Sequence, residues 1–143
     1  MSDAGYSGTP LGRKLGLKDG QEALLLGVPA GLDAIGGFPG FRRCETEIGA
    51  VAARDIDYAH VFETERSALE ELAPKLAARL KPDGMLWISW PKKASKRPTT
   101  LTEDVLREVF LPLGLVDVKV CAVDAVWSGL KFMFRREVRD RLS

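Results

Sequence analysis

The chain has 143 residues, of which 45% are hydrophobic and 29% charged, with a formal net charge of +1. This size and composition are typical of one globular domain that buries roughly 68–70% of its unfolded surface. A net charge near zero argues against a general nucleic-acid or membrane-surface binder, so electrostatic recognition must be local. We expect a single domain over residues 1–143, with an N-terminal arm and short helix in residues 1–20 and a charged tail in residues 136–143.

The sequence also predicts the compartment. The polar start MSDAGYSGTP lacks the apolar segment of a signal peptide, and no apolar run approaches the ~20 residues of a membrane span. Cys44 and Cys121 lie far apart and outside any CxxC spacing, which favours buried free thiols in a reducing compartment. We therefore expect a cytoplasmic protein with no disulfide and no metal site.

The first half of the chain predicts one short helix and then a series of strands. Thr9 and Pro10 suit the N-cap and first position of a helix that ends at Gly16. Strands are predicted over residues 22–26 (EALLL), 41–48 (an edge strand) and 56–62 (IDYAHVF).

A glycine-containing loop follows the first of these strands. Gly27 and Gly31 lie four residues apart with Pro29 between them, and a short helix is expected over residues 32–35. A strand, a glycine loop and a helix in this order open many nucleotide-binding folds. Gly27 and Gly31 are therefore candidate ligand-binding residues, with a purely structural turn as the competing interpretation.

A longer helix is predicted over residues 63–80, with Thr64 as its N-cap. Pro74 inside this segment predicts a kink or two shorter helices, since a mid-helix proline costs ~3 kcal/mol or more. Leucines at spacings of three and four form one apolar stripe: Leu69, Leu72, Leu76 and Leu80.

The rest of the chain is organised around residues 80–95, LKPDGMLWISWPKKAS. Residues 82–84 (PDG) predict a tight turn, and residues 85–90 predict a strand that ends at Pro91. A continuous apolar run suits a strand covered on both faces of a parallel sheet. Trp87 and Trp90 should point to opposite faces, with Trp90 either in the core or walling a pocket.

Cations crowd the chain directly after this strand, where open α/β sheets bind ligands. A helix expected to begin at Thr100, with Glu103 in capping-box spacing, would add unpaired backbone N–H groups. One interpretation is a solvated loop, and the other is an anion site. The candidate ligand-binding residues here are Trp90, Lys92, Lys93 and Ser95, with Lys96 and Arg97 nearby.

The C-terminal part predicts an antiparallel hairpin of strands over residues 116–123 and 129–135. The first strand alternates, with its valines on one side and Asp117 and Lys119 on the other. Trp127 and Ser128 lie in the turn and are candidates for partner contact, with core capping as the alternative. His60, the only histidine, is expected to be a hydrogen-bonded core residue.

The βα series, the segment LKPDGMLWIS and the terminal hairpin together resemble the class I S-adenosylmethionine-dependent methyltransferase fold over residues 22–135. In that family L-K-P-x-G precedes the fifth strand, and the hairpin supplies the sixth and seventh. The chain is more similar still to a small bacterial family of unknown function with this Rossmann-like core. That similarity rests on residues 6–11 (YSGTPL), 90–95 (WPKKAS), 101–103 (LTE), 114–124 (GLVDVKVCAVD) and 127–131 (WSGLK).

The sequence departs from the methyltransferase pattern at the cofactor loop. The family has an acidic residue followed by GxGxG, whereas LLLGVPAG has no acid and inserts Pro29. Only Glu45 and Glu47 are candidates for the ribose-binding acid of the second strand. The chain before Asp57 is also too short for two further complete βα units.

We therefore expect an α/β fold: a single, truncated class I methyltransferase-like Rossmann domain whose mostly parallel sheet of about six strands ends in an antiparallel hairpin. The leading functional hypothesis is a non-catalytic domain that binds an anionic small molecule or a protein partner at the strand carboxyl ends. The alternative is a minimal or partner-completed methyltransferase, for which the resemblance implies S-adenosylmethionine as cofactor. No nucleic-acid partner is expected, and a homo-oligomer stays open.

Overall fold

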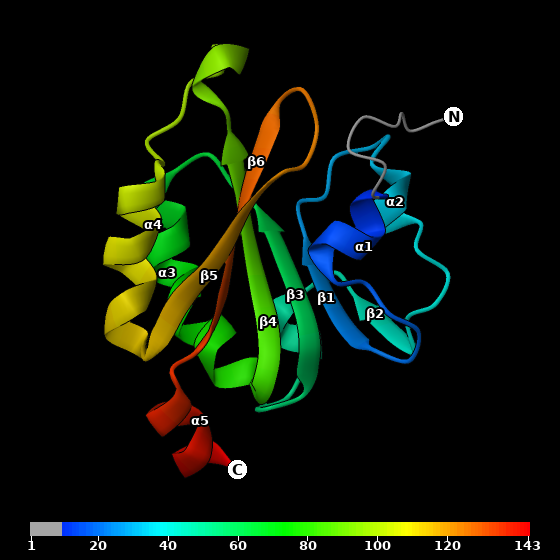
Figure 1. The fold of residues 1–143 in the computed structure, drawn as a ribbon, viewed down its shortest axis with the longest axis vertical. Helices are drawn as coiled ribbons and strands as arrows, with labels where there is room; N and C mark the ends of the chain where they lie inside the picture. Colours follow the sequence, from blue (N-terminus) through cyan, green and yellow to red (C-terminus); the bar gives the residue numbers. More distant parts are fainter. Residues whose placement is uncertain (1–9) are drawn as a thin grey trace.

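The computed structural model describes residues 10–143, which form one six-stranded sheet in the order β2-β1-β3-β4-β6-β5 (Figure 1). The strands from β2 to β4 are parallel, whereas β6 is antiparallel to both β4 and β5. The predicted mostly parallel sheet with a terminal hairpin is confirmed. The strands are β1 (Glu22–Leu26), β2 (Arg43–Glu45), β3 (Ile56–Phe62), β4 (Leu80–Pro91), β5 (Leu115–Ala122) and β6 (Trp127–Phe134).

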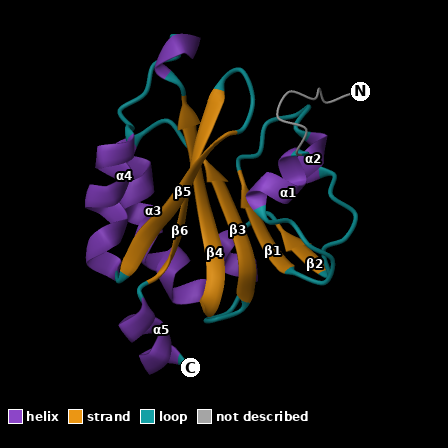
Figure 2. Cartoon of the chain, viewed as in Figure 1, coloured by secondary structure: helices purple, strands orange, loops and turns teal. Residues whose placement is uncertain are grey.

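Helices cover both sides of this sheet, with α3 and α4 on one side and α1 and α2 on the other (Figure 2). None of the helices within residues 10–143 is both long enough and apolar enough to cross a membrane. The helices are α1 (Leu11–Leu15), α2 (Asp33–Gly36), α3 (Arg66–Arg79), α4 (Glu103–Phe110) and α5 (Arg136–Leu142), with 3-10 turns η1 (Ile48–Ala50), η2 (Lys93–Ser95) and η3 (Leu111–Leu113).

The core has one apolar cluster on each side of the sheet. Trp90 belongs to the cluster beneath α3 and α4, and Trp87 belongs to the cluster beneath α1 and α2. The predicted opposite orientation of the two tryptophans is confirmed. The Trp87 indole N–H donates to the Leu15 carbonyl at 2.8 Å, which ties α1 to the central strand.

The predicted turn at residues 82–84 is wrong, because this segment is part of β4. Ile56 pairs with Leu80 and Tyr58 pairs with Met85, so β4 advances five residues where β3 advances two. The extra residues form a bulge. A Cβ on Gly84 would lie 2.8 Å from the Ile56 carbonyl oxygen, so glycine is required there by a close strand contact.

The predicted N-caps of α3 and α4 are also wrong. The helix α3 begins at Arg66, and Thr64 does not cap it. The hydroxyl of Thr100 instead accepts a hydrogen bond from the Arg66 backbone N–H at 2.6 Å. The N-cap of α4 is Thr102, whose hydroxyl accepts from the Val105 N–H at 3.2 Å. The loops before the two helices bond to each other, which local spacing does not reveal.

Other segments agree with the predictions in part. The helix α1 ends at Gly16 as expected, but Pro10 is its N-cap position; the proposed cap Thr9 lies outside the described residues. The strand expected over residues 41–48 is an edge strand of only three residues. The helix α3 runs through Pro74 as one helix.

Two features differ from expectation: the alternation along β5 and the exposure of one cysteine. Asp117 pairs with Phe132 and Lys119 with its neighbour Lys131, so the two lie on opposite faces and the predicted single side for the valines is wrong. The reason is the register shift between Asp117 and Lys119, and the valines are 38% (Val116), 50% (Val118) and 50% (Val120) exposed. Cys121 is a buried free thiol as predicted, whereas Cys44 is exposed.

Candidate functional site

The glycine loop and the basic loop lie at the same end of the sheet. The glycine loop follows β1 and the basic loop follows β4, which are both parallel to β3, and β3 lies between them. Figure 1 shows α2 and η2 at this end of the molecule. The carboxyl ends of parallel strands in open α/β sheets are where ligands bind, so both loops occupy the expected position.

The basic loop borders a hollow of about 420 Å³, which we call the basic hollow. Its floor is apolar, and Trp90 is 8% exposed there. The start of α4 forms the opposite wall. The lining residues are Trp90, Pro91, Lys93, Lys96, Arg97, Pro98, Thr99, Leu101, Thr102 and Glu103.

The cations of the basic hollow have no ion-pair partner within residues 10–143. The carboxylates at the start of α4 could have neutralised them. Glu103 and Asp104 instead bind the Arg107 guanidinium, at 3.3 and 3.0 Å. The side chains of Lys93 and Lys96 are therefore free to meet an anion.

Two predicted site residues shape the loop and do not line the basic hollow. The Ser95 hydroxyl donates to the Lys92 carbonyl at 2.7 Å, and the Lys92 N–H donates to the Val126 carbonyl at 2.7 Å. Lys96 closes the turn with a left-handed backbone, φ +60°. These contacts hold Lys93 and Lys96 at the mouth of the hollow.

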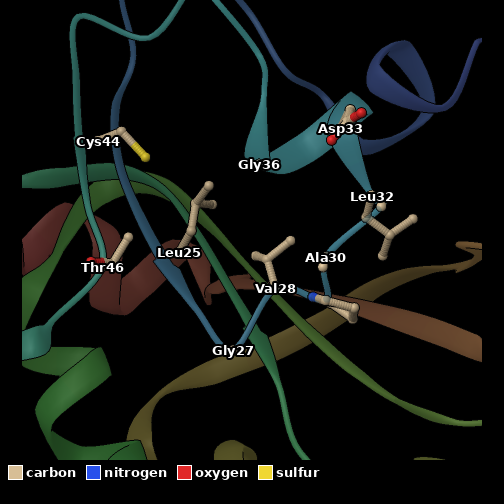
Figure 3. Close-up of a pocket in the computed structure, with 11 residues that line it drawn as sticks. Leu25, Gly27, Val28, Ala30, Leu32, Asp33, Gly36, Cys44 and Thr46 are labelled. Carbon is tan, nitrogen blue, oxygen red and sulfur yellow. The ribbon is translucent and has the colours of Figure 1, made fainter.

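The glycine loop borders a second hollow of about 450 Å³, the glycine-loop hollow (Figure 3). Gly27 has φ +74°, and a Cβ there would lie 2.8 Å from the Phe62 carbonyl oxygen. Gly31 has φ +95° with open space around it. The lining residues are Leu25, Gly27, Val28, Pro29, Ala30, Gly31, Leu32, Asp33, Gly36, Cys44 and Thr46.

The two hollows share no lining residue, so the structure divides the predicted site residues into two groups. Gly27 and Gly31 line one hollow, and Trp90 and Lys93 line the other. Between them lies the carboxyl end of β3. The glycines and the basic loop therefore belong to two separate candidate sites.

The predicted partner-contact residues Trp127 and Ser128 lie at the start of β6, beside the end of β4, so their predicted place in the turn is wrong. Trp127 packs its ring edge-on against Phe62 with 5.1 Å between ring centroids, and it is half-buried. Ser128 is the pairing partner of Trp90 on β4. Trp127 therefore helps to cover the end of β3.

A buried polar chain that the sequence reading missed crosses β3 and β4. His60 Nδ1 lies 2.9 Å from the Tyr58 hydroxyl, and His60 Nε2 lies 2.7 Å from the Ser89 hydroxyl. All three residues are fully buried, so the predicted hydrogen-bonded core histidine is confirmed. Ser89, the one polar residue in an apolar run, was the visible indication, but its partner depends on strand register.

Burial lowers the pKa of His60 to about 3 and raises the pKa of Tyr58. His60 is therefore neutral at pH 7, with one ring nitrogen donating and the other accepting. A Cβ on Gly129 would lie 3.1 Å from the Trp87 ring and 3.2 Å from the Ser89 hydroxyl. The backbone of β6 therefore packs directly against the hydrogen-bonded group of Tyr58, His60 and Ser89 and helps to keep water away from it. None of the three residues lines either hollow, so this hydrogen-bonded group is part of the core.

The described chain offers no ready metal centre: residues 10–143 contain no group of three or more His, Cys, Asp or Glu side chains that could hold an ion.

Several solved structures with a similar fold are methyltransferases. A SAM-dependent methyltransferase from Aquifex aeolicus is 17% identical, with TM-score 0.60 over 86% of this chain and 87% of that chain. Magnesium protoporphyrin IX methyltransferase from Synechocystis, solved with bound SAM, is 10% identical, with TM-score 0.57 over 82% and 71%. Mitomycin 7-O-methyltransferase is 13% identical, with TM-score 0.63 over 87% of this chain and 53% of that chain.

The fold is that of the class I methyltransferases. The Rossmann-like, methyltransferase-like core expected from the sequence is thereby confirmed. No family model and no curated protein matches the sequence. Because all three identities are low, the likeness concerns the methyltransferase fold alone.

The residues of the glycine-loop hollow fit the cofactor of this fold only in part. Its size and its glycine backbone suit a ligand, but neither candidate for the ribose-binding acid lines it. The Glu45 carboxylate lies 3.4 Å from the Arg43 guanidinium, while its neighbours Cys44 and Thr46 face the hollow. Asp33, the carboxylate that does line it, belongs to α2. The donor set therefore differs from the one the resemblance implies, and no methyl-transfer step follows from it.

Proposed function

We propose that this chain is a non-catalytic binding domain that takes a small organic anion in the basic hollow at the carboxyl end of β4. The observation that carries the proposal is the combination of an apolar floor with cations that have no carboxylate partner within residues 10–143. An apolar floor favours a ligand with an aromatic or alkyl body, and the cations favour a carboxylate or phosphate group.

The start of α4 supports the same proposal. Its first backbone N–H groups face this end of the sheet, and helix N-termini attract anions. Thr102 uses its hydroxyl for Val105, which leaves other N–H groups of the first turn available. The cations and these donors together supply the recognition, and Trp90 supplies the apolar contact.

Phenyl phosphate is a suitable probe, with inorganic phosphate and phenol as partial probes. We expect phenyl phosphate to bind more tightly than either part, as measured by calorimetry. Lys93→Ala with Lys96→Ala should weaken binding roughly five- to tenfold, because each exposed charge contact contributes ~0.2–1 kcal/mol. The free energy of unfolding should change by less than ~0.5 kcal/mol.

Lys92→Ala is the matched control for Lys93→Ala alone, since Lys92 lies in the same loop but outside the hollow lining and each variant removes one charge. Equal loss of affinity in these two single variants would show that the loop's net charge, rather than the hollow, attracts the probe. Unchanged binding in the double variant would refute the site.

The second candidate function is that of a minimal or partner-completed S-adenosylmethionine-dependent methyltransferase. It is favoured by the glycine-loop hollow together with the fold of the similar structures, one of which holds bound SAM. It predicts micromolar binding of S-adenosylhomocysteine in calorimetry. No heat of binding at millimolar ligand would dispose of it, whereas methyl transfer to any acceptor would overturn the non-catalytic proposal.

A further inference from the structure

A second surface lies away from both hollows, along the free edge of the sheet. Val116, Val118 and Val120 on β5 are the large hydrophobic side chains that residues 10–143 leave exposed. β5 is the last strand of the sheet, so one side of its backbone has no neighbouring strand in the described chain (Figure 2). Unpaired backbone groups beside apolar side chains can accept another extended segment.

Lysines gather beside this edge. Lys119 on β5 lies directly opposite Lys131 on β6, and like charges in that position repel. The charges of Lys119 and Lys18 also lower the pKa of Lys131, although burial is the larger cause. Burial raises the pKa of the Cys121 thiol, whereas the charges of Lys14 on α1 and Lys119 lower it. The four lysines come from α1, the loop after it, β5 and β6, and the strand register brings Lys119 and Lys131 together directly.

No carboxylate within residues 10–143 forms an ion pair with any of these lysines. The nearest acidic residue of β5, Asp117, binds the Arg107 guanidinium at 3.1 Å instead. We call this surface the lysine–valine edge and define it as Lys14, Lys18, Val118, Lys119, Val120 and Lys131.

The geometry of β5 discriminates between possible occupants. The register between β5 and β6 shifts between Asp117 and Lys119, which places a bulge at Val118. The bulge limits an added strand to the part of β5 beside it, and edge lysines hinder pairing with a strand of the same charge. A second copy of β5 would bring its own unneutralised lysine to this edge. A strand with acidic side chains would instead neutralise Lys119 and Lys131.

We propose that the lysine–valine edge docks an extended acidic segment of another protein, in which Asp or Glu alternates with apolar residues. The acidic side chains meet Lys119 and Lys131 on one face of the sheet. The apolar side chains of the segment cover Val120 on the other face, because Val120 pairs with Leu130, the neighbour of Lys131 on β6. A peptide is favoured over nucleic acid because this surface has valines where single-strand binders place stacking aromatic residues.

The test uses a fluorescein-labelled peptide of alternating valine and aspartate, with binding followed by fluorescence anisotropy. Two further peptides, alternating Ser–Asp and alternating Val–Lys, separate the apolar from the acidic requirement. We expect the Val–Asp peptide to bind most tightly, and its affinity to fall with added salt. Lys119→Ala with Lys131→Ala should weaken it about tenfold, since two charge contacts are lost.

Lys75→Ala with Arg136→Ala is the matched control, because it removes the same number of positive charges at exposed positions of α3 and α5. If Lys131→Ala disturbs folding, as judged by circular dichroism, Lys119→Ala alone at its exposed position provides the comparison.

Equal affinity of the double variant and the control pair would overturn the proposal, as would tighter binding of an oligothymidylate than of the Val–Asp peptide. A dimer of the protein alone in analytical ultracentrifugation, lost in Val118→Ser, would assign the edge to a second copy and overturn it equally. Loss of phenyl phosphate binding at the basic hollow would leave this result unaffected, so the two proposals fail independently.

Discussion

The glycine-loop hollow and the basic hollow lie at the same end of the sheet, but different physical demands shape them. In the first, the packing of the strands explains the glycine: Gly27 passes so close to the Phe62 carbonyl that no side chain fits. In the second, no ion pair within residues 10–143 explains Lys93 and Lys96. A glycine in a ligand-like loop can therefore serve packing alone, whereas unpaired cations beside a buried tryptophan point to something outside the chain.

The largest effect is expected from Gly27→Val. A β-branched residue at φ +74° is strained, and its Cβ would lie 2.8 Å from the Phe62 carbonyl oxygen. We expect the free energy of unfolding to fall by about 2–4 kcal/mol, measured by urea denaturation. Such a loss would show that packing requires this glycine in the absence of any ligand.

Gly31→Ala is the control, because Gly31 has a similar positive φ but open space around it. It should cost only about 1 kcal/mol, the conformational part of the effect. Similar losses in the two variants would remove the distinction, because backbone strain would then account for both glycines.

The sequence predicted the elements that depend on local pattern. The apolar run around Trp87 identified β4, and the alternation near Leu130 identified the hairpin. A strand buried on both faces needs a continuous apolar run, whereas a strand buried on one face needs only every second residue to be apolar. The position of the basic loop at the strand carboxyl ends followed from the same reading. These are properties that neighbouring residues determine together.

Features that depend on register or on distant segments could not be read in this way. Thr100 matches a capping box by spacing, yet it bonds to Arg66 across 34 residues. Ser89 meets His60 only because β3 and β4 pair in one particular register. The division of the candidate residues between two hollows likewise depends on the strand order, in which β3 lies between β1 and β4. The residues of the two loops do not reveal that order.

A smaller effect is expected from the pH dependence of the unfolding free energy, through the buried histidine of β3. His60 on β3 has a pKa of about 3 in the folded protein and an ordinary value of 6.5 when unfolded. The stability that neutral His60 contributes is fully present above pH 6.5. It falls as the pH drops toward 3, because in this range only the unfolded protein binds the proton. Between pH 7 and pH 5 this linkage alone removes about 2 kcal/mol.

His60→Gln is the reference, since it keeps a polar side chain but removes the titration. The difference in unfolding free energy between the two proteins, followed by urea denaturation from pH 7 to pH 5, isolates the histidine from the carboxylates. Parallel pH curves for the two proteins would mean that His60 titrates normally.

The smallest effect tests the wall of the basic hollow. Thr102 is the N-cap of α4 and lines the hollow, and its hydroxyl accepts the Val105 N–H at 3.2 Å. Thr102→Ala should cost about 1 kcal/mol and speed hydrogen exchange at Val105, while Thr102→Ser should preserve both. Because the glycine-loop hollow makes no contact with this helix end, fraying there should weaken phenyl phosphate binding and leave any S-adenosylhomocysteine binding unchanged. If both ligands weakened together, the two hollows would be parts of one site, and β3 would not separate them.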